Sequence, residues 1–156
     1  MNDPAREIEQ LLYVYAERID AGDFAGVGEL LAHTAIVTPE GQPFATGADE
    51  IRRLYEQTTR LYPDDGTPHT QHVITNVIVE FEQGAGRARA RSRFTVLQAL
   101  PDFPLQTIVA GRYRDRFECV DGVWRFCERC MLVEHFGDTS RHLLVDLQGG
   151  GSEGAG

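Results

Sequence analysis

The sequence has 156 residues, which suits one domain with its own core and is too short for two ordinary domains. Its formal net charge of −9 disfavours nucleic acid or an anionic membrane as the main partner, because phosphate binding depends on clustered Lys and Arg. No apolar run approaches the ~20 residues that span a bilayer, and the acidic N-terminus does not resemble a signal peptide. A cytoplasmic location is therefore expected by default.

The basic and sulfur-containing residues exclude two kinds of chemistry. All 15 basic residues are arginine, which excludes a Schiff base on a lysine amine. The 3 cysteines are an odd number and fit reduced thiols better than a disulfide framework. Cys127 and Cys130 have the C-x-x-C spacing, but residues three apart on a strand point to opposite faces, so we interpret both as packing residues.

The N-terminal part predicts three helices. Asp3 and Pro4 are typical of a helix start, and apolar residues then recur at helical spacing as far as Ile19. The expected elements are a helix over 4–19, a short helix over 24–31, a strand over 34–38, a turn over 39–43 and a helix over 47–61.

From residue 69 the spacing becomes typical of strands. Four long strands are expected over 69–83, 87–100, 105–120 and 123–136, and their short connections indicate an antiparallel meander. Residues 137–147 are expected to pack on the domain or on a partner subunit. One domain over 1–147 is therefore predicted, followed by a Gly-rich disordered tail over 148–156.

Arginines alternate with small or apolar residues on two neighbouring strands. Arg87, Arg89, Arg91 and Arg93 share one face of the second long strand, and Arg112, Arg114 and Arg116 repeat the pattern on the next. Such arginines more often cover a solvated or subunit-facing sheet surface than bind a ligand. We therefore expect an arginine-rich outer face that can form a homo-oligomer, a dimer or trimer.

Four short patterns together resemble a known family. They are Tyr15-x4-Asp20-x2-Asp23, His69-x2-His72-x3-Asn76, Gly111-Arg112-Tyr113-x-Asp115-x-Phe117 and Asp121-Gly122-x-Trp124-Arg125-Phe126-x2-Arg129. In order and spacing, the chain resembles a SnoaL-like domain of the nuclear-transport-factor-2-like superfamily. The resemblance implies a cone-shaped α+β barrel, in which three N-terminal helices pack on a strongly curved antiparallel sheet around a pocket. Relatives include scytalone dehydratase, steroid isomerase, bile-acid dehydratase, polyketide cyclase and small subunits of aromatic-ring dioxygenases.

His72 is the first candidate catalytic residue. A neutral imidazole accepts a proton near pH 7, which suits removal of a proton next to a carbonyl group. Ile74, Asn76 and Ile78 follow it at strand spacing, so we expect Ile74 and Asn76 to line a substrate pocket beside it. The alternative is a hydrogen-bonded histidine at the end of a strand.

Asp20 and Tyr15 complete the predicted catalytic set. The resemblance implies that Asp20 orients His72, although the helical wheel places Asp20 off the apolar stripe unless the helix bends after Ile19. Tyr15 lies on that stripe, where a buried phenol either polarises a substrate oxygen or simply packs in the core.

Three more residues are weaker candidates for substrate binding. The enzymatic relatives carry a further acid on the second long strand, where this chain reads Arg93-Phe94-Thr95-Val96-Leu97. Asp115 and Arg129 can substitute for it only if they face inward. Tyr55 is either a core residue or part of the pocket wall.

Two functions of different class remain open. One is a lyase or isomerase without cofactor that acts on a small hydrophobic cyclic molecule such as a polyketide, steroid or aromatic precursor. The other is a non-catalytic ligand-binding or scaffold subunit, favoured by the missing strand acid. A metal site is not expected, because His69 and His72 point to opposite faces of a strand.

Overall fold

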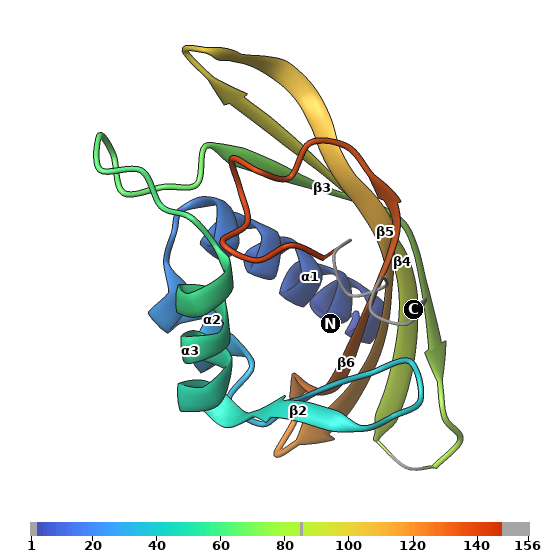
Figure 1. Ribbon diagram of the computed structural model, residues 1–156. Coiled ribbons are helices and arrows are strands. Elements are labelled where there is room, and N and C mark those ends of the chain that lie inside the picture. The colour runs from blue at the N-terminus through green and yellow to red at the C-terminus, as the bar shows by residue number, and fades with distance from the viewer. Residues whose placement is uncertain (1–2, 85, 148–156) are drawn as a thin grey trace, which may run out of the picture.

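The computed structural model describes residues 3–84 and 86–147 as three helices packed on a six-stranded sheet (Figure 1). In chain order the elements are α1 (Pro4–Asp20), α2 (Phe24–Leu30), β1 (Ala35–Val37), β2 (Pro43–Thr46), α3 (Gly47–Thr58), β3 (Thr70–Phe81), β4 (Arg87–Leu100), β5 (Phe103–Val120) and β6 (Val123–Phe136). The predicted α+β class and cone shape are confirmed. The tail expected over 148–156 lies outside the described residues.

The sheet has the strand order β2-β1-β6-β5-β4-β3 and is curved but not closed. The long strands β3 to β6 form the predicted antiparallel meander. However, β1 pairs with β6 in parallel, so the sheet is mixed rather than wholly antiparallel. The strand β2 was not predicted, because Pro43 looked like the end of a turn, but its residues pair with β1.

The helix α1 lies on the concave side of the sheet (Figure 1). The Asp3 side chain caps it by accepting hydrogen bonds from the backbone N–H groups of Ala5 and Arg6 at 3.1 and 3.4 Å. The apolar stripe is buried as predicted, including Ile8, Leu12 and Ile19. No helix in the described parts of the chain is long and apolar enough to cross a membrane.

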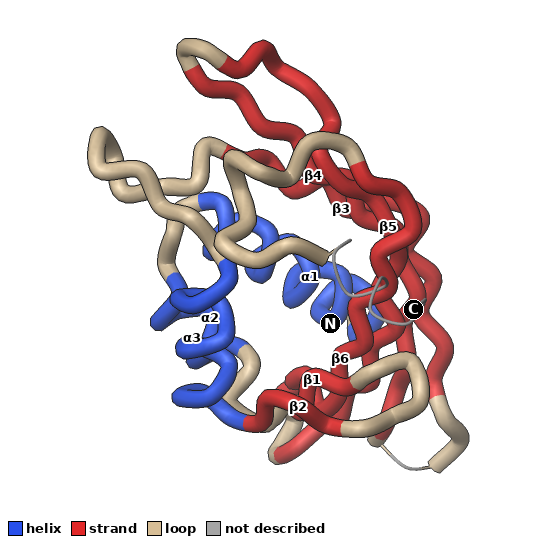
Figure 2. Tube along the Cα trace, viewed as in Figure 1, coloured by secondary structure: helices blue, strands red, loops and turns tan. Residues whose placement is uncertain are grey.

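The other two helices pack together beside α1. The last helix, α3, ends at Thr58 and not at Leu61, because Thr59 has extended backbone angles. Leu61 consequently lies in the following loop and is exposed. Figure 2 shows this loop in tan at the upper left, beyond the end of α3.

The alternation of arginines is confirmed on β4 and β5. Their arginines are exposed, whereas the residues between them are buried. Glu80 on β3 forms ion pairs with Arg89 and Arg91, and Glu134 on β6 forms ion pairs with Arg93 and Arg112. The outer face is therefore a lattice of arginines and glutamates rather than an unbroken basic patch.

Candidate active site

Asp20 and His72 form a hydrogen-bonded dyad between α1 and β3. Asp20 Oδ1 lies 2.6 Å from His72 Nδ1, and Asp20 Oδ2 accepts the backbone N–H of His72 at 2.7 Å. Thr70 Oγ1 donates to Asp20 Oδ1 at 2.9 Å. The side chain of His72 is only 7% exposed. Since Nδ1 faces a carboxylate, Nε2 is the nitrogen left for proton transfer.

Asp20 reaches His72 without any bend in the helix. It is the last residue of α1, about 100° around the helix from Ile19, so it lies at the margin of the apolar stripe. The first long strand, β3, packs against α1, and its first residues Thr70 and His72 meet the Asp20 carboxylate. The requirement for a bent helix end was therefore wrong, because the sheet edge lies beside the helix as well as beneath it.

The face of β3 beyond His72 changes direction at a bulge. Ile74 packs against the core, but Asn76 has a positive φ of 53° and is exposed, and the pairing with β4 shifts between Thr75 and Ile78. After the bulge Val77 packs against the core and Ile78 is exposed. The expectation that Asn76 shares a face with His72 was therefore wrong.

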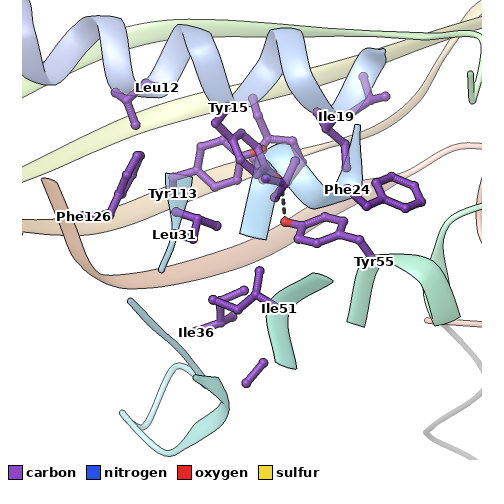
Figure 3. Packing of buried hydrophobic residues seen from close by; sticks show 14 of the residues in the cluster. Leu12, Tyr15, Ile19, Phe24, Leu31, Ile36, Ile51, Tyr55, Tyr113 and Phe126 are labelled. Atoms are coloured by element: carbon purple, nitrogen blue, oxygen red, sulfur yellow. Dashed lines mark hydrogen bonds between the residues drawn. The ribbon is translucent and has the colours of Figure 1, made fainter. Parts of the chain in front are cut away.

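Tyr15 and Tyr55 meet inside the core. Their hydroxyl oxygens are 2.6 Å apart, as the dashed line in Figure 3 shows. Burial raises the pKa of Tyr15, although nearby Arg129 opposes the shift, so the phenol stays protonated at neutral pH. Its ring meets that of His72 edge-on, with 6.4 Å between centroids. Tyr15 thus lies next to the dyad while its hydroxyl is bonded to Tyr55.

Asp115 and Arg129 both face inward and form an ion pair. Asp115 Oδ1 is 3.0 Å from Arg129 Nε, and both side chains are fully buried. The guanidinium group lies 4.1 Å from the ring centroid of Tyr15 and 3.7 Å from that of Tyr113. Burial raises the pKa of Asp115 to about 6 against the opposing effect of Arg129. These side chains lie between α1 and the sheet.

His142 is a neighbour of the dyad that the sequence did not reveal. It lies far from Asp20 and His72 in the chain, and its ring centroid is 6.4 Å from that of His72. No spacing pattern signals this proximity, because residue 142 follows the last strand in a loop segment.

Possible metal ligands come together in the described residues at one exposed group, Asp64, Asp65 and His69. Here the His69 ring is bonded to Asp64 at 2.9 Å, away from the dyad. The described surface also has hollows of about 430 to 530 Å³, which are lined by residues other than Asp20 and His72.

Solved structures with the same architecture include three from Novosphingobium aromaticivorans. A putative scytalone dehydratase is 22% identical, with a TM-score of 0.64 and 85% of each chain covered. An NTF2-like protein with a cystatin-like fold is 20% identical, with a TM-score of 0.66 over 87% of this chain and 85% of that one. The beta subunit of a putative aromatic-ring-hydroxylating dioxygenase is 17% identical, with a TM-score of 0.63 over 85% and 90%.

These identities demonstrate a shared fold and no more. No curated protein matches the chain. The family described as the SnoaL-like domain matches residues 4–130, which is most of the chain and includes Asp20, His72 and Arg129. The protein therefore belongs to the SnoaL-like domain family, within the nuclear-transport-factor-2-like fold that the sequence motifs predicted.

Proposed function

We propose that this protein is a lyase or isomerase without cofactor, which moves protons on a small hydrophobic cyclic molecule. The observation that carries the proposal is the Asp20–His72 dyad, with 2.6 Å between carboxylate oxygen and ring nitrogen. A carboxylate at Nδ1 fixes the ring orientation and stabilises the imidazolium that forms when Nε2 takes a proton. The same pairing of base and orienting acid recurs in many proton-transfer enzymes.

The proposed reaction begins at a carbon next to a carbonyl group. His72 Nε2 takes the proton, and the electron pair of the broken C–H bond forms an enolate. In a dehydration the neighbouring C–O bond then breaks, and the hydroxyl group takes a proton and leaves as water. In an isomerisation the proton returns at another carbon. Neither course consumes an oxidant or reductant.

The surroundings of the dyad support an apolar cyclic substrate. The Tyr15 ring meets that of His72 edge-on, and Tyr15 in turn contacts the ring of Tyr113 in the core. The similar structure of a putative scytalone dehydratase is consistent with water elimination from a cyclic compound. Tyr15 contacts His72, and its hydroxyl, which is bonded to Tyr55 in this structure, can donate a hydrogen bond to a substrate oxygen once that bond is exchanged.

The test is a panel of cyclic β-hydroxy ketones of increasing ring number, incubated with the protein in deuterated water. Proton NMR then follows exchange next to the carbonyl and loss of water. For a compound that is turned over, we expect His72→Ala to lower the rate about 100-fold or more. His135→Ala is the matched control, because His135 is an exposed histidine on β6. Undiminished activity in a folded His72→Ala variant contradicts the proposed role.

The second candidate function is a non-catalytic ligand-binding or scaffold subunit that assembles as a homo-oligomer. The enzymatic relatives carry a further acid on the second long strand. In this chain Phe94 lies in that stretch, packs in the core and offers no carboxylate, which favours the non-catalytic function. The buried Asp115–Arg129 pair and the aromatic rings of Tyr15 and Tyr113 between α1 and the sheet favour it as well. This function predicts that a cyclic ligand binds equally well to the His72→Ala variant and is never converted.

A further inference from the structure

The segment over 137–147 closes the end of the cone where the dyad lies. It leaves β6 and runs across to the end of α3, as Figures 1 and 2 show. The backbone N–H of Leu144 donates to the carbonyl oxygen of Thr58 at 2.9 Å, and that of Arg60 donates to the carbonyl oxygen of His142 at 2.8 Å. We refer to residues 137–147 as the closing segment.

The closing segment carries one buried polar side chain toward the dyad. His142 is only 5% exposed, whereas its neighbours Ser140, Leu144 and Val145 are exposed. Within the described residues its Nδ1 is buried and has no hydrogen-bond partner. A buried imidazole nitrogen without a partner is destabilising, and an apolar side chain of similar size would avoid that cost. A histidine at this position is therefore better explained by a role in the site than by packing.

The electrostatics keep the His142 ring neutral. Burial lowers its pKa to about 4; the neighbouring His72 acts in the same direction, and Asp20 opposes it. His72 on β3 and Asp20 on α1 are the titratable groups that face it. At neutral pH the ring therefore has one N–H donor and one acceptor nitrogen. A neutral imidazole of this kind can polarise a carbonyl group while a second residue removes the proton.

We propose that His142 is a second active-site group, which the closing segment brings beside His72 so that its ring donates a hydrogen bond to the substrate oxygen that gains negative charge. This inference rests on the proposed proton-transfer function and adds the partner of the base. His72 and Asp20 then form the basic side of the site, and His142 forms the electrophilic side. The substrate oxygen supplies the partner that the buried ring lacks.

The geometry also implies how a substrate enters. The dyad and His142 are all largely buried, so the closing segment must move away from the end of α3 before a cyclic molecule can reach His72. Its contacts with Thr58 and Arg60 are main-chain hydrogen bonds of the last turn and the following loop, which can open and reform together. Closure over the substrate then excludes water from the proton transfer.

The first experiment compares His142→Leu and His142→Gln with the natural chain on a β-hydroxy ketone that the protein converts. Leu fills the space without a donor, whereas Gln keeps an N–H donor. We expect kcat/KM of His142→Leu to fall about 100-fold, with part of the activity recovered in His142→Gln. We also expect the melting temperature of His142→Leu to equal or exceed that of the natural chain. A purely structural histidine predicts the reverse: a lower melting temperature and no rescue by Gln. Natural activity in His142→Leu overturns the proposal.

The second experiment does not need turnover. The probe is 2-naphthol, an aromatic stand-in for an enolate, and NMR follows the ring protons of the histidines. We expect the probe to shift the resonances of His142 and His72, and to bind His142→Leu about tenfold more weakly. If 2-naphthol binds through His142 but no ketone is converted, the proposed proton-transfer function is contradicted and the His142 binding site is supported. Equal binding by His142→Leu, or no binding by the natural chain, overturns the His142 site itself.

Discussion

Asp20 holds His72 through both oxygens of its carboxylate. One oxygen faces the ring nitrogen and accepts the hydroxyl of Thr70, and the other accepts the backbone N–H of His72. The same side chain therefore fixes the start of β3 against α1 and sets the orientation of the imidazole. Its contributions to stability and to proton transfer are separable, because a neutral isostere keeps the shape and loses the charge.

Asp20→Asn is expected to reduce both turnover and stability. The amide can accept the backbone N–H of His72, but it cannot stabilise an imidazolium, so we expect a fall in kcat of about 100-fold or more. Hydrogen bonds to charged groups contribute about 1.5–3 kcal/mol each, so the free energy of unfolding should also fall by a comparable amount. Steady-state kinetics and urea unfolding measure the two effects.

Thr70→Val is the matched control for that substitution. It removes one hydrogen bond to Asp20 and leaves the carboxylate and the His72 contact in place. A fall in turnover of the same size in both variants would show that packing at the start of β3, and not the carboxylate charge, determines the activity.

The buried pair of Asp115 and Arg129 affects the free energy of unfolding differently from the Asp20–His72 dyad. Removing one partner leaves the other uncompensated in the core, whereas removing both can be nearly neutral. The two charges are not equivalent, because Asp115 can take a proton and the guanidinium group cannot lose one. Its pKa of about 6 in the presence of Arg129 already lies well above the 3.8 of an exposed aspartate.

Asp115→Ala is expected to destabilise the protein by about 3–5 kcal/mol at pH 7, and the double variant Asp115→Leu/Arg129→Met to recover most of that loss.

Arg129→Met alone should be destabilising at pH 7 and less so at pH 5. Without Arg129 the folded state holds a proton on Asp115 that the unfolded chain releases, so stability falls as the pH rises. Urea unfolding at both pH values measures this. Equal losses for Arg129→Met at pH 5 and pH 7 would contradict the assignment.

At the scale of elements, periodic stretches were predictable and isolated contacts were not. The helix α1 and the alternating strands β4 and β5 carry a long, regular pattern, so their type and buried face followed from spacing alone. The strand expected over 34–38 is confirmed as β1, but its parallel pairing with β6 depends on residues far along the chain. The strand β2 has four residues, too few for a pattern. The bulge at Asn76 interrupts β3 without any glycine or proline to signal it.

Some residues of the candidate active site could likewise be predicted from the sequence and one could not. Asp20 and His72 could be nominated because their spacing resembles a family pattern, and the structure brings them together. His142 could not be nominated, because its role depends on how a loop segment returns over the cone. A single sequence carries no signal for where a loop segment without periodicity folds back onto the domain.

The closing segment has a side-chain anchor that can be weakened without touching the dyad. Arg141 donates two hydrogen bonds to Asp102, at 2.9 and 3.1 Å, at the turn between β4 and β5. Such a solvent-exposed pair contributes little to global stability because water and salt screen it. It joins the closing segment to the sheet, so its main effect should be on local opening.

Arg141→Ala is therefore expected to speed amide exchange at Leu143 and Leu144 while shifting the melting temperature only slightly. Hydrogen exchange followed by mass spectrometry measures this. Arg125→Ala is the matched control, because Arg125 forms a similar ion pair with Glu118 away from the closing segment. Faster exchange across the whole sheet, or none in the closing segment, would contradict a local anchor.

At the scale of the whole molecule, charge is distributed very unevenly. The chain has a net charge of −9, yet the outer face of β4 and β5 presents alternating arginines. Glu80, Glu128 and Glu134 pair with several of them. Arg114 lies among these pairs with no ion pair of its own in the described residues, beside a hollow of about 510 Å³ that Ile78 and Cys130 also line.

This outer face is the expected contact between copies of the chain. In a two-fold contact the same surface meets itself, so a mixed lattice of arginines and glutamates can place each charge opposite its complement. An unpaired Arg114 on each copy can then meet a carboxylate of the other, beside the hollow that Ile78 also lines. The contact is predicted to be salt-sensitive because these charges lie near solvent.

Light scattering coupled to size-exclusion chromatography tests this at micromolar concentration. We expect a dimer or trimer for the natural chain and a shift toward monomer for Arg114→Glu, since the new carboxylate would face glutamates where a guanidinium group stood. Arg53→Glu is the control, because Arg53 is exposed on α3, away from this face. A monomeric natural chain excludes the predicted oligomer. An oligomer that survives Arg114→Glu at low salt would place the contact elsewhere on the molecule.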